Sequence, residues 1–156
     1  MAISDVMTVA DDILRASKAR GRSLTPLQLM KLTYIAHGYA LGMGIGDLFD
    51  ARIEAWKYGP VIPDLYHATK AYGRDPIPDH LIYEGRALEG AAAKVVDTVL
   101  DRYGDKSGIA LSNLTHRAGT PWSKVYREGE FGIEIPDSLI QQHYRTVVAA
   151  QHDHGV

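Results

Sequence analysis

Apolar residues recur at three- and four-residue spacing through most of this chain, which is the pattern of amphipathic helices. The first such run includes Val6, Val9 and Ile13, begins after a capping residue at Ser4 and ends at Gly21. The chain therefore opens with a predicted helix that buries one face.

The second helix has the clearest beginning in the sequence. Thr25, Pro26 and Gln28 supply a capping threonine, a first-turn proline and a glutamine at capping-box spacing. The following apolar side chains, as far as Leu41, lie on almost every side of the predicted helix, and Lys31 is the main polar interruption. This pattern predicts a central buried helix.

Alternating polar and apolar residues predict a strand over residues 51–57, ended by a turn at 58–60, and a second strand over 131–135 that pairs with the first. Further helices are predicted over 63–73, 86–103 and 107–118, at Thr120–Pro121 and from Pro136 onward. The expected fold is mainly α (α+β): a compact bundle of about six or seven helices around a central helix, with a small β-element. Residues 1–150 are expected to form a single domain and residues 151–156 a flexible tail.

Charge and composition exclude several function classes. A formal net charge of −2 gives no overall basic excess for phosphate binding, so a nucleic-acid partner is not expected. The absence of cysteine removes disulfides, thiolate zinc sites and cysteine nucleophiles. The acidic amino terminus does not resemble an export signal, and the longest apolar run is shorter than the roughly 20 residues of a membrane span. These features predict a cytoplasmic protein without a membrane partner.

Residues that would carry catalysis or hold a metal are scattered. The nucleophile-elbow and phosphate-loop motifs are missing, and Gly42, Gly44 and Gly46 follow a helix rather than a strand, as helix-ending glycines do. Histidines occur on separate predicted elements without metal-ligand spacing: His37, His67, His80, His116 and His143. We therefore expect no enzyme activity, no metal and no cofactor.

Aromatic residues concentrate around one turn, at Gly59-Pro60. One interpretation is structural: Trp56 is buried in the core, and its replacement by alanine costs about 3–5 kcal/mol. The other is that exposed neighbours form a partner-recognition surface, since tyrosine and tryptophan dominate interface energies. The candidate partner-binding residues are Lys57, Tyr58, Tyr66, Lys70 and Tyr72.

Two blocks of sequence resemble a known family. The run MKLTYIAHGYALGMGIGDLFDARIEAWKYGPVIPDLYHATKAYG and the later LSNLTH and Pro121-Trp122 are similar to the signatures of the Panacea antitoxin domain, found in SocA-like and phage-associated GepA-like proteins. The positions that match the signature and are expected to support the fold are Lys31, Tyr34, Trp56, Gly59, Pro60, Pro63, His116 and Trp122.

This resemblance implies an antitoxin that binds and neutralises a cognate, SocB-like toxin. For SocA-like members it further implies an adaptor that delivers the toxin to the ClpXP protease. Two alternatives stay open from the residues themselves. One is a DNA-binding transcriptional regulator using the basic segment 17–22, and the other is a hydrolase using His116.

Overall fold

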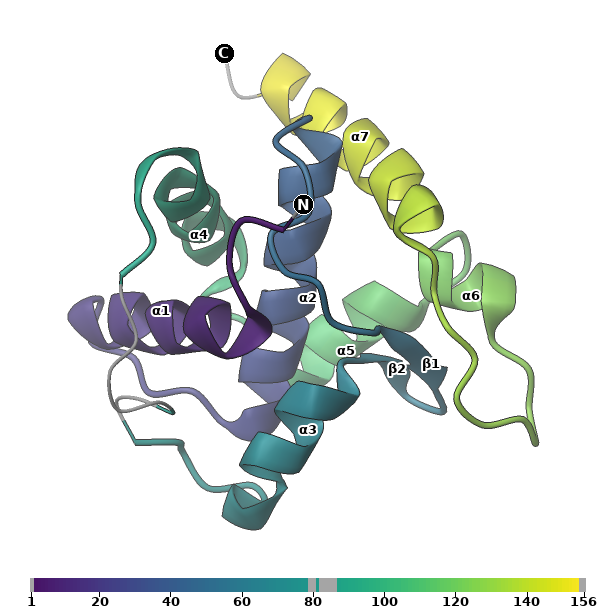
Figure 1. Cartoon of the computed structure of the whole chain (residues 1–156), viewed down its shortest axis with the longest axis horizontal. Coiled ribbons are helices and arrows are strands. Elements are labelled where there is room, and N and C mark those ends of the chain that lie inside the picture. The colour runs from purple at the N-terminus through teal and green to yellow at the C-terminus, as the bar shows by residue number, and fades with distance from the viewer. Residues whose placement is uncertain (1, 79–80, 82–86, 155–156) are drawn as a thin grey trace.

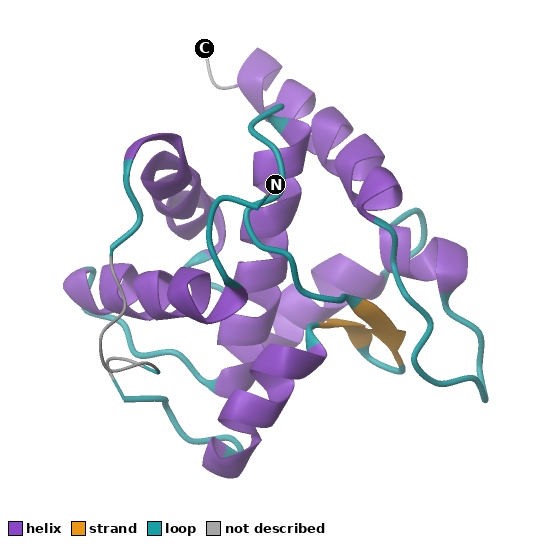
Figure 2. Ribbon diagram, viewed as in Figure 1, coloured by secondary structure: helices purple, strands orange, loops and turns teal. Residues whose placement is uncertain are grey.

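A computed structural model describes residues 2–78, 81 and 87–154. In this part of the chain there are seven α-helices and a two-stranded antiparallel sheet, and one of the helices lies at the centre of the others (Figures 1 and 2). The predicted mainly α fold with a small β-element is confirmed. Within the same ranges, no helix combines the length and the apolar character needed to cross a membrane.

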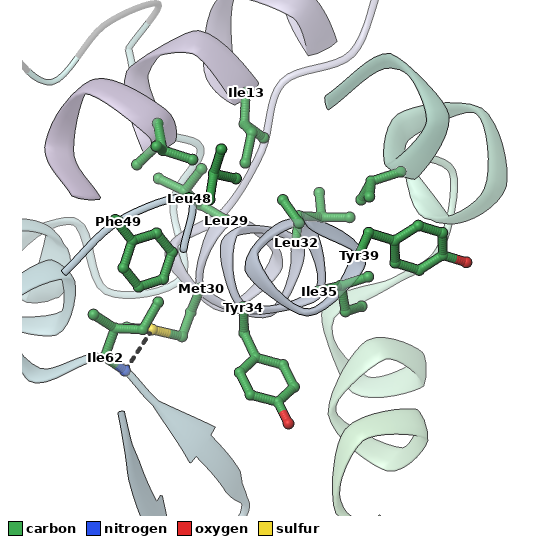
Figure 3. Close-up of a cluster of buried hydrophobic side chains, with 14 of the residues drawn as sticks. Ile13, Leu29, Met30, Leu32, Tyr34, Ile35, Tyr39, Leu48, Phe49 and Ile62 are labelled. Carbon is green, nitrogen blue, oxygen red and sulfur yellow. Dashed lines mark hydrogen bonds between the residues drawn. The ribbon is translucent and has the colours of Figure 1, made fainter. Parts of the chain in front are cut away.

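Helix α2 (Pro26–Gly42) is the central helix. The capping box at its beginning forms as predicted: Gln28 N donates to Thr25 Oγ1 at 3.3 Å, and Thr25 N donates to Gln28 Oε1 at 2.9 Å. All its residues from Leu29 to Leu41 are buried. Figure 3 shows apolar side chains from several other segments around it, among them Ile13, Phe49 and Ile62.

Helices α1 (Val6–Ala19), α4 (Gly90–Tyr103) and α7 (Asp137–His154) pack against α2. Helix α7 approaches closely because α2 presents glycines to Tyr144. A Cβ atom added at Gly38 would overlap the Tyr144 ring, and one added at Gly42 would lie 2.6 Å from the Tyr144 carbonyl carbon. The two helices therefore meet at a distance that larger residues would prevent.

Several predicted boundaries differ from the structure. The residue that caps α1 is Asp5 rather than Ser4: Thr8 N donates to Asp5 Oδ1 at 2.9 Å. Helix α4 was predicted from residue 86, but residues 87–89 are not helical, and residue 86 lies outside the described residues. Helix α7 continues through residues 151–154, which were expected to belong to the flexible tail, while residues 155–156 lie outside the described part. Tyr39 of α2 donates a hydrogen bond to Gln151, so the end of α7 is attached to the core.

The remaining helices surround the sheet (Figure 1). Helix α3 (Pro63–Thr69) is followed by a short 3-10 helix, η1 (Lys70–Tyr72). Helices α5 (Gly108–His116) and α6 (Pro121–Val125) come later in the chain, and α5 contacts both α2 and the second strand. Threonine and serine caps begin these two helices as the sequence predicts.

The sheet is a hairpin of β1 (Glu54–Trp56) and β2 (Gly59–Val61), with Trp56 opposite Gly59. The predicted second strand at 131–135 was wrong in extent: it meets β1 through one bridge, Glu54–Glu134, and flanking hydrogen bonds. The predicted turn at 58–60 lies one residue earlier, because Gly59 adopts a φ of 123° and starts the returning strand. Pairing with the adjacent segment also costs less loop entropy than pairing with a distant one.

Candidate partner-binding site

The tip of the hairpin is held by side chains that bind its backbone carbonyl groups. Trp122 Nε1 of α6 donates to the carbonyl oxygen of Trp56 at 2.5 Å. Ser112 Oγ of α5 donates to the carbonyl oxygen of Tyr58 at 2.7 Å. A hairpin of only two strands is marginally stable alone, so these contacts fix its position against the helices.

Lys31, a buried lysine of α2, also binds backbone carbonyl groups at the tip of the hairpin. Lys31 Nζ lies 2.9 Å from the carbonyl oxygen of Pro60 and 3.5 Å from that of Tyr58. The Lys31 side chain is almost fully buried, and this burial lowers its pKa to about 8. Gly59 has a φ of 123°, which favours glycine, and a Cβ atom there would lie 2.8 Å from Lys31 Nζ and would displace this ammonium group.

The later signature residues support this arrangement. His116 Nδ1 donates to the Ser112 carbonyl oxygen at 2.5 Å, and its ring meets Trp122 edge-on at 5.3 Å. Trp122 also stacks on Tyr126 with ring centroids 4.5 Å apart. The two sequence blocks that resemble the family therefore form one structural unit, in which α5 and α6 hold the hairpin.

Two other signature residues lie elsewhere. Pro63 begins α3 directly after the hairpin. Tyr34 is buried in the core, where its ring meets Tyr144 edge-on at 6.1 Å. These positions fit structural roles, and neither reaches the surface around the hairpin tip.

A groove of about 420 Å³, here called the lysine groove, lies on one side of the hairpin. Among the described residues that line it there are three lysines but no aspartate or glutamate; the lining residues are Pro26, Leu27, Met30, Lys31, Trp56, Lys57, Tyr58, Val61, Tyr66, Thr69, Lys70 and Gly73. Lysine side chains thus give this concave, largely apolar surface a positive character.

A second groove of about 720 Å³, here called the glutamate groove, lies on the other side. It is lined by three glutamates and by aromatic residues of two segments: Glu54, Ala55, Trp56, Lys57, Tyr126, Glu128, Gly129, Glu130, Phe131 and Gly132. Only Trp56 and Lys57 line both grooves. The hairpin therefore separates a groove lined by lysines from one lined by glutamates, of which Glu54 pairs with Arg52 and Glu130 with Arg127.

Large aromatic side chains are exposed around both grooves. Phe131 is 97% exposed and Tyr58 is 68% exposed. Trp56 was expected in the core, but it is only half-buried: its ring meets Tyr66 at 5.0 Å and its Nε1 donates to Glu54 Oε1 at 3.0 Å. This hydrogen bond is the main cause that lowers the pKa of Glu54. Exposed aromatics of this kind are typical of interaction surfaces.

The structure brings together four of the five predicted partner-binding residues. Lys57, Tyr58, Tyr66 and Lys70 all line the lysine groove, whereas Tyr72 is half-buried against the core and does not line it. The sequence reasoning missed Leu27 and Phe131, which are exposed at the grooves. Leu27 belongs to the apolar pattern of α2, and only its place in the first turn distinguishes it from the buried positions.

A polar cluster away from the grooves was also missed. His37 Nε2 lies 3.0 Å from Asp137 Oδ1, and with Asp47 these residues place one possible metal-ligand atom each within 4.8 Å of one another. The hydrogen bond from His37 lowers the pKa of Asp137, while the contact with Asp137 raises that of Asp47. No spacing motif predicts this group, because its members come from three separate segments.

His80, another of the histidines considered in the sequence, lies outside the described residues.

The basic segment 17–22, the candidate for DNA recognition, is engaged within the protein. Arg20 forms ion pairs with Asp101 and, at 3.3 Å, with Asp97 of α4. Ser17 is buried at the end of α1. Its carbonyl oxygen accepts hydrogen bonds from the backbone N–H groups of Arg20 and Arg22, where the chain leaves the helix. The segment therefore closes a helix against α4 rather than extending a recognition helix.

Comparison with known proteins identifies the class. Residues 29–123 match the family model of the antitoxin SocA-like Panacea domain, so this chain belongs to that family. The matched region includes most of α2, the hairpin, α5 and the first half of α6. The chain is also 30% identical to Antitoxin SocA of Caulobacter vibrioides (strain NA1000 / CB15N), over 90% of this chain and 82% of that protein. No solved structure gave a match.

Proposed function

We propose that this protein is an antitoxin, which neutralises a cognate protein toxin by direct binding and delivers it to the ClpXP protease. Membership of the SocA-like family is the observation that carries this proposal. The toxin would be SocB-like, and both proteins would act in the cytoplasm.

The geometry supports binding through the hairpin surface. Exposed aromatic residues there lie beside two grooves, and side chains from three helices fix the hairpin that separates them. A rigid surface loses little conformational entropy on binding. A contact of roughly 800 Å² on each partner, with a few aromatic anchors, is sufficient for a stable complex.

Co-expression tests this function. The neighbouring reading frame is induced with and without this protein, in hosts with and without ClpX, and growth and toxin level are followed. We expect rescue with loss of the toxin only where ClpX is present. Rescue in both hosts without toxin loss would establish sequestration and remove the adaptor role. Toxicity that this protein does not change would remove the antitoxin function for that pair.

A further inference from the structure

The three lysines of the lysine groove lack acidic partners. Lys57 Nζ lies 5.5 Å from the centre of the Tyr58 ring, and Lys70 Nζ lies 3.5 Å from His67 Nδ1. Among the described residues, the hydrogen bonds of Lys31 Nζ go to the backbone carbonyl oxygens of Tyr58 and Pro60. Across the described residues, none of these ammonium groups is within ion-pair distance of a carboxylate.

Lys31 gives the groove a buried positive charge. Its ammonium has three N–H donors, and carbonyl oxygens of the hairpin account for two of them. Burial disfavours the charged form and lowers its pKa to about 8. A carboxylate placed near this group would restore the electrostatic stabilisation that burial removes, and would do so more strongly than at an exposed lysine.

The apolar walls of the lysine groove favour a ligand that has an apolar side chain next to its carboxylate. Leu27 and Tyr66 are 42% and 39% exposed at its sides, and Met30 and Val61 complete an apolar lining between the lysines. A concave apolar surface with a few charged groups orients a bound side chain by its polar end.

We infer that the lysine groove binds a segment of the toxin in which a carboxylate, from aspartate, glutamate or the chain terminus, stands next to an apolar or aromatic side chain. The apolar side chain lies against Leu27, Met30 and Tyr66, and the carboxylate faces the lysines. This inference rests on the proposed antitoxin function and adds the chemistry of the partner. Charge complementarity selects such a segment over a basic or purely apolar one.

Zero-length cross-linking tests the contact directly. The complex of this protein with the toxin of the neighbouring reading frame is treated with a water-soluble carbodiimide, which joins a lysine amine to a carboxylate that touches it. We expect cross-links from Lys57 or Lys70, both exposed, to one acidic segment of the toxin. Lys94, exposed on α4 away from the hairpin, is the matched control and should give none (Figure 1).

Charge reversal measures the contribution of the contact. Lys57→Glu and Lys70→Glu change exposed residues and should retain the fold, which circular dichroism and the melting temperature verify. We expect each to weaken toxin binding by at least about tenfold, while Lys94→Glu binds as the unchanged protein does. Replacing the cross-linked carboxylate of the toxin by lysine should restore binding to Lys70→Glu.

The outcomes separate the two proposals. If the two proteins associate and growth is rescued, but Lys57→Glu and Lys70→Glu bind normally and cross-links come from other lysines, the groove proposal is wrong and the antitoxin function stands. If cross-links reach the groove from a segment without an apolar neighbour, the stated chemistry is wrong. If no complex forms and growth is not rescued, both proposals fail.

Discussion

At the scale of single residues, Lys31 connects the core to the hairpin surface. It is the rare case of a lysine buried in a central helix, and the carbonyl oxygens of the hairpin are the groups it binds. The sequence identified it as a polar interruption in an apolar helix. The sequence did not show which groups Lys31 binds, because every residue has a backbone carbonyl group and residue type does not show which of them meets the lysine.

The titration of Lys31 should make stability depend on pH. Burial lowers its pKa from 10.5 to about 8, so between these values the unfolded chain binds a proton that the folded chain has lost. The free energy of unfolding therefore rises with pH between these two pKa values, by roughly 2 kcal/mol from about pH 8 to pH 9.5. Urea unfolding of the unchanged protein and of Lys31→Met at several pH values measures the difference between them.

Two comparisons make this test specific. Buried tyrosines, such as Tyr34 and Tyr144, have raised pKa values and oppose the trend above about pH 10, but they are the same in both proteins and cancel in the difference. Lys94→Met removes an exposed lysine of α4 and is the control for the loss of one positive charge. Parallel profiles for Lys31→Met and the unchanged protein would show that Lys31 keeps an ordinary pKa.

Trp56 should matter more for binding than for folding. It is half-buried and lines both grooves, so Trp56→Ala is expected to cost about 1–2 kcal/mol of stability rather than the 3–5 kcal/mol of a core tryptophan. Toxin binding, measured by calorimetry at a temperature where the variant is folded, should fall by more than tenfold, on the order of a hot-spot residue. A loss of about 3–5 kcal/mol, together with normal toxin binding by the folded fraction, would show instead that the role of Trp56 is structural.

At the scale of elements, the contact between α2 and α7 depends on glycine. Gly38→Ala replaces glycine by a better helix former, which alone stabilises a helix by about 1 kcal/mol. The added methyl group overlaps the ring of Tyr144, however, so we expect a net loss of about 1–3 kcal/mol. Thermal unfolding of the single variants and of the combination with Tyr144→Ala measures the coupling.

The combined variant decides the cause. Once Tyr144→Ala has removed the ring, Gly38→Ala should become neutral or stabilising, so the double variant should lose less stability than the two single variants lose together. If Gly38→Ala destabilises equally in both backgrounds, steric overlap with Tyr144 is not the reason.

Elements whose signals are local were predictable from the sequence, and pairings between distant segments were not. The capping box fixed the beginning of α2, and its apolar residues on all sides predicted the central position. The hairpin partner was misassigned because alternation over 131–135 resembles a strand, while the short segment Gly59–Val61 contains glycine and proline and resembles a turn. Burial of Trp56 was misjudged because residue type does not reveal which face of a short hairpin stays open.

The candidate site was predictable to a similar extent. Aromatic clustering around Gly59-Pro60 located the surface, and four predicted residues meet in the lysine groove. Phe131, Glu128 and Glu130 of the glutamate groove come from a segment more than 70 positions away from β1, so only the fold brings them beside the hairpin and Glu54.

At the scale of the whole molecule, the distribution of charge favours a protein partner over nucleic acid as a hypothesis. The net charge is −2, and a lysine-lined groove and a glutamate-lined groove lie on either side of one hairpin. A DNA-binding surface needs several cations aligned along a phosphate backbone, whereas here Arg20 of the basic segment already pairs with Asp97 and Asp101.

We therefore expect that this protein does not retard a DNA fragment of its own promoter in an electrophoretic assay at about 150 mM salt, where nonspecific binding by exposed lysines is largely screened.

Binding to the toxin should persist at that salt, because apolar contacts at the grooves do not depend on ionic strength, while the association rate should fall as salt rises. Arg20→Ala, which removes the ion pairs with α4, serves as the control and should leave both results unchanged while lowering stability slightly. A sequence-specific shift at this salt that Arg20→Ala abolishes would instead favour a transcriptional regulator, because it would show that the basic segment leaves α4 to contact DNA.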